Sequence, residues 1–327
     1  MDLRPLLLAL SDGQFHSGEK LGQRLSISRS AVWKQIERLR KMGVEVHSVT
    51  GKGYRLPAGL ALMSRQTIFE YLDATTIEWV RDLELLFSTT STNAEAMLRA
   101  QAGVERCVIM AEHQTQGRGR RGRSWASPLG ANIYLSMVAS FQAGVAALEG
   151  LSLAVAVYVV RALEKYGIVG LGVKWPNDIL IDGRKLAGIL LEVSGDLTGP
   201  CKIVIGIGLN VRMPAAMSLL IEQPYTDLAL NFRGHLDRDK IVAGIIRELA
   251  LGLVEFNNSG FISLRSSWDK LDVYKGRMVE IRAGSNLIQG RVKGVSETGA
   301  LLLETNSGPR TVAGGEIMPS MRPWPGN

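Results

Sequence analysis

The sequence is poor in the residues that build covalent or metal-based scaffolds. Its 327 residues include two cysteines, Cys107 and Cys201, and four histidines, with no CxxC spacing and no metal-type histidine spacing. A disulfide framework and a zinc ribbon are therefore excluded. Low cysteine usage of this kind is typical of a reducing compartment, so we expect the protein to be cytoplasmic.

Long apolar segments are lacking as well. The longest apolar run, residues 151–160, contains Ser152 and ends at Arg161, whereas a bilayer crossing needs roughly 20 residues. At the amino terminus, a short apolar stretch stops at Ser11 and shows no small-residue cleavage site. The sequence predicts neither a membrane span nor a secretion signal. A P-loop and a nucleophile-base motif are also missing.

What is present fits a packed protein of several domains. The chain is 46% hydrophobic and 21% charged, and 327 residues suggest two or three domains. The net charge of +7 is uneven, because residues 1–58 hold ten basic and five acidic side chains, or +5, which leaves +2 for the rest. This basic start favours a module that meets a polyanion, although a solvated basic face has the same composition.

The periodicity of this basic segment predicts a winged helix-turn-helix. Residues 18–25 and 29–42 fit two short helices capped by Ser17 and Ser28, and an alternating, glycine-rich stretch from Val44 to Pro57 fits a hairpin. The second helix would enter the major groove while the hairpin tip meets phosphate. A helix-turn-helix used only for packing or dimerisation is the alternative. The expected DNA contacts are Ser28, Arg29, Trp33, Lys34 and Lys52.

The remainder of the chain mixes both types of secondary structure. We expect helices starting near Asn93 and spanning 145–166 and 239–256. Strands are expected at 83–87, 107–111, 132–139, 172–174, 178–181, 186–193 and 202–210, largely as an antiparallel meander. From Val273 to Ile317 the pattern is strands and turns, as in a small barrel. The fold class is therefore α+β with three modules.

The most unusual segment is 114–125, which reads QTQGRGRRGRSW. Four arginines alternate with glycines, so that guanidinium groups and backbone amides can converge on an anion such as a nucleotide phosphate. A solvated arginine loop or a nucleic-acid contact is the competing interpretation. The GxGxxG match is not a dinucleotide fingerprint, because no helix follows at once and residues 132–142 contain no acid.

Four further clusters follow the same logic. Asp178, in KWPND, can hold the magnesium of a nucleotide, and Lys185, before an apolar strand, can clamp a carboxylate or phosphate. Residues 88–93, STTSTN, offer hydroxyl and amide groups to a neutral polar group such as a ureido. Residues 206–210, GIGLN, allow close backbone approach to a ligand. Turns, surface lysines, helix capping and small strand residues are the corresponding structural interpretations.

Taken in order, these blocks resemble one family over essentially the whole chain. The winged module, Ser91-Thr92-Asn93, the arginine loop, KWPND, KLAGI at 185–189, GxGxN ending at Asn210 and GGEI at 314–317 are similar to the bifunctional biotin protein ligases that repress the biotin operon. The resemblance implies ATP-dependent formation of biotinyl-5'-adenylate and biotin transfer to a lysine of the biotin carboxyl carrier protein of acetyl-CoA carboxylase. It also implies a homodimer, formed with adenylate bound, that binds operator DNA of biotin-synthesis genes.

The resemblance assigns the site by residue. Catalysis falls to Lys185, Arg118 and Arg120, and the magnesium that accompanies ATP to Asp178. The biotin contacts are Ser91, Thr92, Asn93, Gln114, Arg118, Gly119, Arg120, Lys185, Gly188 and Gly206. The ATP and adenylate contacts are Arg118, Arg121, Asn177, Lys185, Asn210 and Tyr225.

The same resemblance sets the domain organisation that we expect. A winged helix-turn-helix at 1–60 precedes a biotin- and ATP-binding catalytic domain at 61–272 with a largely antiparallel sheet. An SH3-like β-barrel at 273–327 follows. Two other functions are possible for such a sequence. A repressor that senses a ligand without catalysis is disfavoured by the phosphate-binding cluster, and a lipoate-attaching enzyme is disfavoured by the winged module.

Overall fold

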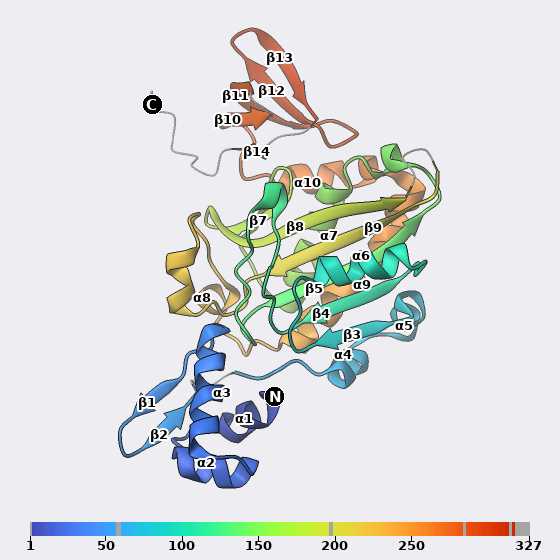
Figure 1. Ribbon diagram of the computed structural model, residues 1–327. Helices are drawn as coiled ribbons and strands as arrows, with labels where there is room; N and C mark the ends of the chain where they lie inside the picture. Colours follow the sequence, from blue (N-terminus) through green and yellow to red (C-terminus); the bar gives the residue numbers. More distant parts are fainter. Residues whose placement is uncertain (1, 57–59, 196–198, 284–285, 314–315, 318–327) are drawn as a thin grey trace.

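The computed structural model describes residues 2–56, 60–195, 199–283, 286–313 and 316–317. Three parts follow one another along the chain (Figure 1), with the N-terminal module at one end, the C-terminal sheet at the other and the large sheet between them. The predicted α+β class with three modules is confirmed.

The N-terminal module is a helix-turn-helix followed by a short hairpin. Ser17 and Ser28 cap the second and third helices, since each hydroxyl accepts the backbone N–H three residues on. The predicted strand from Val44 is wrong in its first half, because Val44 and Val46 are buried in the module's core and pairing begins only at His47. The elements are α1 (Arg4–Leu10), α2 (Gly18–Leu25), α3 (Arg29–Lys41), β1 (His47–Val49) and β2 (Gly53–Arg55).

This module rests directly on the central domain. Leu129, from the loop before the third strand of the large sheet, is buried in the hydrophobic cluster of the N-terminal module. Its backbone N–H donates to the carbonyl oxygen of Met42, just after α3, at 2.8 Å. A Cβ added at Gly43 would lie 2.7 Å from Pro128 Cβ, so the two segments are in close contact.

The central domain contains a seven-stranded sheet in the order β3-β4-β5-β9-β8-β7-β6. The pair β3 and β4 is parallel and the other pairs are antiparallel, which confirms the largely antiparallel sheet. Its strands are β3 (Leu83–Leu86), β4 (Cys107–Ala111), β5 (Ile133–Phe141), β6 (Leu171–Lys174), β7 (Asp178–Ile181), β8 (Arg184–Gly195) and β9 (Cys201–Leu209). Its longer helices are α4 (Arg65–Tyr71), α5 (Ala74–Val80), α6 (Thr92–Gln101), α7 (Leu151–Tyr166), α9 (Arg238–Ser259) and α10 (Arg265–Leu271). Short helical segments are η1 (Arg120–Gly122), η2 (Val145–Leu148), η3 (Ala215–Leu220), α8 (Leu228–Asn231) and η4 (Phe261–Ser263).

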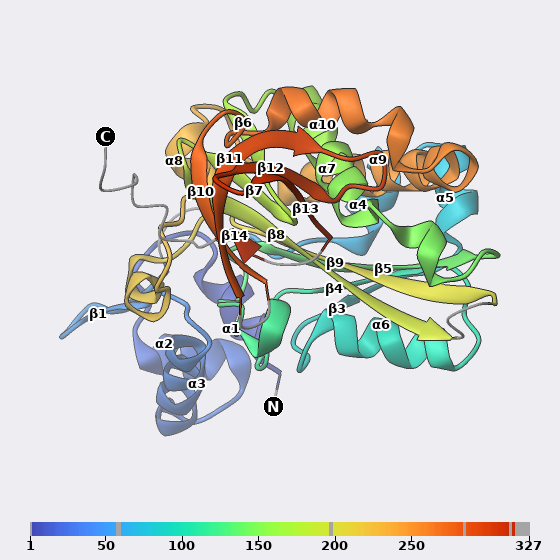
Figure 2. The ribbon, with the colours of Figure 1, turned by 90° about the horizontal axis from the view of Figure 1, so that it is seen from above.

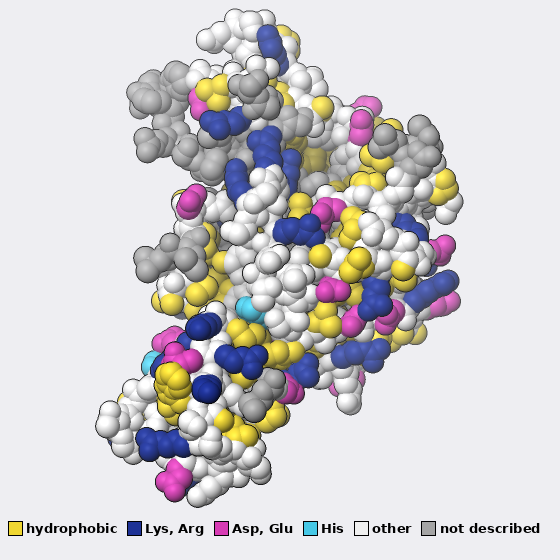
Figure 3. Space-filling view, in the orientation of Figure 1, with side chains coloured by type: hydrophobic (Ala, Val, Ile, Leu, Met, Phe, Trp, Pro, Cys, Tyr) yellow, Lys and Arg dark blue, Asp and Glu magenta, His cyan; other side chains and the backbone are white. Residues whose placement is uncertain are grey.

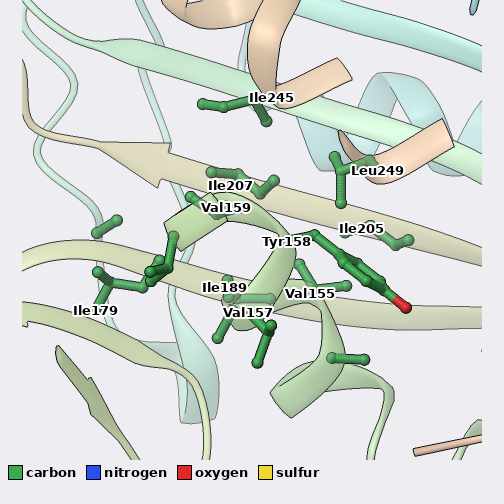
Figure 4. Close-up of a cluster of buried hydrophobic side chains, with 14 of the residues drawn as sticks. Val155, Val157, Tyr158, Val159, Ile179, Ile189, Ile205, Ile207, Ile245 and Leu249 are labelled. Atoms are coloured by element: carbon green, nitrogen blue, oxygen red, sulfur yellow. The ribbon is translucent and has the colours of Figure 1, made fainter. Parts of the chain in front are cut away.

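Helices cover the two faces of this sheet unequally. Helix α6 lies on one face, whereas α7 and α9 lie on the other (Figure 2). Strand residues point alternately to the two faces, so Ile205 and Ile207 of β9 pack with α7 and α9 (Figure 4), while Gly206 and Gly208 face the α6 side. The main core therefore lies on the α7 side, and the α6 side is left partly open.

The predicted helix over 145–166 is interrupted. The segment η2 ends at Leu148, Gly150 has φ +76°, a left-handed conformation, and α7 begins at Leu151. A Cβ at Gly150 would also lie 2.5 Å from Phe261 Cβ. By length and composition Val145–Tyr166 could cross a membrane, but 56% of its most apolar window is buried inside the protein, as in a core helix.

The C-terminal domain is a small antiparallel sheet in the order β13-β12-β11-β10-β14. The indole Nε1 of Trp175, in KWPND, donates to the Gly299 carbonyl oxygen at 3.0 Å and joins this domain to the central one. The pairings among its described residues are those of a sheet, and an SH3-like closure stays a prediction. Gly314 and Gly315 lie outside the described residues. The strands are β10 (Met278–Ala283), β11 (Asn286–Val295), β12 (Leu301–Thr305), β13 (Gly308–Val312) and β14 (Glu316–Ile317).

Candidate active site

A pocket opens on the α6 face of the central sheet, where the start of α6 meets the arginine loop. All ten residues that the family resemblance assigned to biotin line it, so positions up to 115 residues apart in the chain come together. The described lining residues are Ser91, Thr92, Asn93, Gln114, Arg118, Gly119, Arg120, Trp125, Tyr134, Asn177, Lys185, Gly188, Ile189, Leu190, Gly206, Ile207 and Gly208.

Three glycines form the floor of this pocket, and each has a steric reason. A Cβ at Gly206 would lie 2.1 Å from Asn93 Oδ1, and a Cβ at Gly208 would lie 2.4 Å from Trp125 Cε2. At Gly188 the nearest atom would be Trp125 Cζ3, at 3.0 Å. The Trp125 indole therefore lies close to bare backbone, and its Nε1 is buried without a hydrogen-bond partner among the described residues.

One end of the pocket is polar and uncharged. Gln114 Oε1 accepts the Thr92 backbone N–H at 2.8 Å, and Gln114 Nε2 donates to Ser127 Oγ at 2.9 Å. Ser91 precedes α6, yet its hydroxyl makes no capping hydrogen bond. Helix capping, the structural interpretation offered for these hydroxyl residues, therefore does not account for Ser91, which lines the pocket.

The other end is basic. Lys185 Nζ lies 2.8 Å from Asp178 Oδ1 and 5.3 Å from the centroid of the Trp125 ring. The side chains of Lys185 and Asp178 are 15% and 14% exposed, so this ion pair is well shielded from solvent. Lys185 is thus held as a fixed positive charge beside the glycine floor, with a carboxylate that balances it.

The arginine loop folds over the pocket and makes its own contacts. Arg118 Nη1 lies 3.5 Å from Glu192 Oε1, and Arg120 Nη1 donates to Asn177 Oδ1 at 3.3 Å. Arg121 has φ +56°, an unusual value for a residue other than glycine, so the loop adopts a sharp turn there. The loop, which contains the short segment η1, therefore brings two guanidinium groups to the pocket.

The predicted nucleotide contacts are only partly brought together. A second cavity, next to the first, is lined by Arg121, Asn177 and Asp178 among others, and Lys185 lines both cavities. Asn210 lines neither, because its Nδ2 donates to the Thr226 carbonyl oxygen at 3.0 Å and it is buried. Tyr225 is half-buried and forms a backbone bridge with Lys185, outside the described lining of both cavities.

Metal-binding side chains are sparse around these cavities. Within the described ranges, the structure contains no group of three or more His, Cys, Asp or Glu side chains that could hold a metal ion. Asp178 provides one carboxylate. Mg²⁺ is commonly held by one or two carboxylates together with substrate phosphates, so Asp178 fits a magnesium that arrives with the nucleotide rather than a resident ion.

The predicted DNA contacts lie together on the N-terminal module. Arg29, Trp33 and Lys34 are exposed on α3, with Trp33 53% exposed, and Lys52 is exposed in the turn of the hairpin. Ser28 instead caps α3. Lys and Arg side chains are spread over this module in Figure 3, in agreement with its excess of basic residues.

Sequence reasoning missed several residues of the pocket. Trp125 and Gly208 line the pocket, and Ser127 accepts a hydrogen bond from Gln114. Ser136 is buried behind Thr92, and Glu192 contacts both Arg118 and Asn93. Two of these had a signal in the sequence. Glu192 stands four residues after Gly188 on one strand, and Gly208 two after Gly206, so the period of two places each on the pocket face.

Comparison with family models gives three matches in chain order. Residues 4–55 match an HTH domain, residues 84–210 match the biotin/lipoate A/B protein ligase family, and residues 275–318 match the biotin protein ligase C-terminal domain. Each match falls on one of the three parts of the structure.

Similar proteins agree with these matches. The chain is 40% identical over 313 residues to the bifunctional ligase/repressor BirA of Escherichia coli (strain K12), covering 95% of both chains, and 30% identical to that of Bacillus subtilis (strain 168), covering 95% and 96%. A solved biotin protein ligase from Aquifex aeolicus, in complex with biotin and ATP, superposes with a TM-score of 0.62 at 27% identity, over 72% of this chain and 97% of that one. The chain therefore belongs to the family of bifunctional biotin protein ligases and repressors.

Proposed function

We propose that this protein is an ATP-dependent biotin protein ligase that also represses biotin-synthesis genes. The single observation that carries the ligase function is the pocket itself, which joins an uncharged hydrogen-bonding end to a basic end across a glycine floor. Biotin has the same polarity, with a neutral ureido ring at one end and a carboxylate at the other. The similar Aquifex aeolicus ligase was solved with biotin and ATP.

In the first half-reaction, a carboxylate oxygen of biotin attacks the α-phosphorus of ATP and pyrophosphate leaves. Two anionic groups must come into contact, so catalysis depends on fixed positive charge where they meet. Lys185, Arg118 and Arg120 are the residues proposed to supply it. Lys185 is already held beside the floor by Asp178, and the biotin carboxylate is ionised near neutral pH, so this step needs no general base.

In the second half-reaction, the amine of a lysine on the biotin carboxyl carrier protein attacks the acyl carbon of biotinyl-5'-adenylate. An amide bond forms, AMP leaves and the amine loses a proton. The arginine loop is proposed to close over the adenylate and keep out water, which would otherwise hydrolyse it. Ser91, Thr92, Asn93, Gln114, Gly119, Gly188 and Gly206 are proposed to hold the biotin end, and Arg121, Asn177, Asn210 and Tyr225 the nucleotide end.

Magnesium is proposed to accompany the nucleotide. Asp178 would hold it together with the phosphates, and the ion would neutralise part of the triphosphate charge. Because Asp178 also pairs with Lys185, the carboxylate orients the lysine as well.

The ligase function is tested by incubating the full chain with biotin, ATP, Mg²⁺ and a biotin carboxyl carrier domain, and then probing the carrier with streptavidin. We expect labelling that requires both biotin and ATP, and none on a carrier whose acceptor lysine is changed to arginine. If the chain binds biotin but never labels the carrier, it is a ligand-sensing repressor without catalysis.

The repressor function is proposed for the winged module, residues 1–60, acting in a homodimer. The central and C-terminal domains are proposed to span 61–272 and 273–327, and the protein to work in the cytoplasm. One small module makes too few contacts for an affinity near the typical specific range of about 10⁻⁸ M or tighter, whereas two modules on a dyad suffice. We expect biotin and ATP together to tighten binding to a palindromic operator of biotin-synthesis genes.

A gel-shift titration measures this linkage. Lys34→Ala and Lys52→Ala should each lower the slope of log K against log salt by about one, because each removes one phosphate contact. Lys165→Ala, on the central domain, is the matched control and should leave the slope unchanged. Operator binding that ignores biotin and ATP would contradict the switch.

A further inference from the structure

A chain of buried hydrogen bonds runs behind the uncharged end of the pocket. Glu192 Oε2 accepts from Asn93 Nδ2 at 2.7 Å, and Asn93 Oδ1 lies 2.6 Å from Ser136 Oγ. Ser136 Oγ in turn lies 2.8 Å from Thr92 Oγ1. Asn93, Ser136 and Thr92 are at most 4% exposed, and only Thr92 and Asn93 line the pocket.

Counting protons fixes the direction of this chain. A carboxylate only accepts hydrogen bonds, so Asn93 must turn its NH₂ group to Glu192 and its carbonyl oxygen to Ser136. Ser136 has one proton and lies within reach of two acceptors, Asn93 Oδ1 at 2.6 Å and Thr92 Oγ1 at 2.8 Å. The nearer acceptor, Asn93 Oδ1, holds this proton away from Thr92.

The consequence appears at the pocket wall. The Thr92 hydroxyl donates its own proton to Gln114 Oε1 at 3.2 Å, and the same oxygen accepts the Thr92 backbone N–H. With the Ser136 proton held by Asn93, Thr92 Oγ1 presents lone pairs to the pocket. Thr92 is therefore an acceptor, ready for a ligand that brings an N–H group.

We infer that Glu192 is a specificity-determining positioning residue, whose carboxylate acts through Asn93 and Ser136 to set Thr92 as an acceptor for a ureido N–H. The inference rests on the proposed function, in which Thr92 meets biotin. It also gives Asn93 a role different from direct contact, since both polar atoms of its amide are already used within the protein. Gly206 is needed for this arrangement, because any Cβ at that position would displace Asn93 Oδ1.

The ion pair of Glu192 with Arg118 is the competing explanation for any effect of Glu192. That contact is 3.5 Å long, and its partners are 46% and 29% exposed. Exposed pairs of this kind contribute little, whereas the hydrogen bond to Asn93 is short, charge-assisted and buried on the Asn93 side. The two explanations differ in what glutamine at position 192 should do.

The test compares Glu192→Met with Glu192→Gln in the full chain. Glutamine keeps a carbonyl oxygen for Asn93 but loses the charge that faces Arg118, whereas methionine removes the acceptor at similar size. We expect Glu192→Met to raise KM for biotin about tenfold, the scale of one lost hydrogen bond, with KM for ATP within twofold. Glu192→Gln should stay within about twofold of the parent for both substrates.

A biotin analogue methylated on a ureido nitrogen adds a second readout. Analogues methylated at either nitrogen are compared with biotin, because an N-methyl group cannot donate to Thr92. The parent should prefer biotin to the affected analogue by about tenfold or more, and Glu192→Met should lose most of that preference. A purely structural effect would weaken biotin and both analogues equally.

Ser136→Ala tests the chain at a second point, because it removes the proton that Glu192 is inferred to keep away from Thr92. Ser136→Ala alone should raise KM for biotin less than Glu192→Met does, and in the double variant it should recover most of the affinity that Glu192→Met loses. Glu192→Leu serves as the second acceptor-free variant if Glu192→Met fails to fold. An unchanged KM for biotin in the acceptor-free variant, a double variant as impaired as that variant alone, or a Glu192→Gln protein as impaired as it would overturn the inference. A parent chain that forms no adenylate would instead overturn the proposed function.

Discussion

The two faces of the central sheet differ although the same strands form both. On the α7 side, Ile205, Ile207 and Leu135 are buried in a continuous apolar core. On the α6 side, Gly206 lines the pocket, and Ser136, next to Leu135 on its strand, is buried behind Thr92. A strand with a period of two thus carries stability on one face and ligand chemistry on the other.

This division has a physical advantage. The core face fixes the strands with many close contacts, so the pocket face can leave backbone bare without local collapse. Bare backbone at Gly206 and Gly208 gives room to Asn93 and Trp125, and the polar side chains next to them keep defined orientations. Mutations on neighbouring residues should therefore separate stability from binding.

The largest expected difference between the two faces is tested at two adjacent residues of β9. Ile205→Ala should lower the free energy of unfolding by about 2–5 kcal/mol, because Ile205 is fully buried and the substitution leaves a cavity. Gly206→Ala should act mainly on binding, since its Cβ would force Asn93 away, and we expect a clear rise in KM for biotin. Chemical denaturation and steady-state kinetics on both variants provide the measurement.

The matched control for this pair is Gly244→Ala. Gly244 lies in α9, and a Cβ there meets nothing within 4 Å. Gly244→Ala should neither raise KM for biotin nor lower the free energy of unfolding. The comparison fails if Ile205→Ala raises KM for biotin in folded protein as strongly as Gly206→Ala does.

The next largest effect concerns the basic end of the pocket. Lys185→Ala should slow pyrophosphate release by a factor of about 10² to 10³, the scale of about 3 kcal/mol for one preorganised electrostatic group. Arg184→Ala, an exposed cation on the same strand, is the control and should stay near the parent rate. A folded Lys185→Ala protein that releases pyrophosphate at the parent rate would remove Lys185 from catalysis.

A smaller effect concerns a partly buried carboxylate, Asp272, at the junction with the C-terminal domain. Burial raises the pKa of Asp272 to about 6, and its Oδ2 has no hydrogen-bond partner among the described residues. Stability from this group is complete below about pH 4 and is lost as the pH rises through 6, because the ionised form is disfavoured when folded. Asp272→Asn should therefore be more stable than the parent at pH 7.5, by about 1–3 kcal/mol.

Thermal unfolding of both proteins from pH 4 to pH 8 checks the sign. The advantage of Asp272→Asn should shrink toward pH 4, where the parent carboxyl is protonated. An advantage that is the same at every pH would show that ionisation of Asp272 is not its cause.

Much of the fold could be predicted from the sequence, since local patterns set it. Capping serines and apolar periodicity located α2 and α3, and the strand 107–111 was predicted with its observed bounds. The errors have tertiary causes. The helical pattern over 145–166 is interrupted at Glu149 and Gly150, where Phe261 leaves no room for a Cβ on Gly150. Val44 is buried in the core of the module instead of pairing in the hairpin.

The site was predictable where short motifs carry it and not where it depends on register between distant strands. The biotin residues came from contiguous blocks, and the structure brings all ten to one pocket. Ser136 and Glu192 stand in ordinary strand sequence, and their role depends on which strands pair with β9 and on the position of α6. Asn210 lies in a motif, yet its amide stabilises the segment at Thr226.

The central claim is that this pocket couples biotin to ATP, and pyrophosphate release without a carrier protein tests it most directly. The full chain is mixed with ATP and Mg²⁺, with and without biotin, and pyrophosphate is followed in time. We predict a burst of about one pyrophosphate per active site that requires biotin and then nearly stops, because the adenylate stays bound. Pyrophosphate release that is equally fast without biotin, or no release with it, would contradict the account.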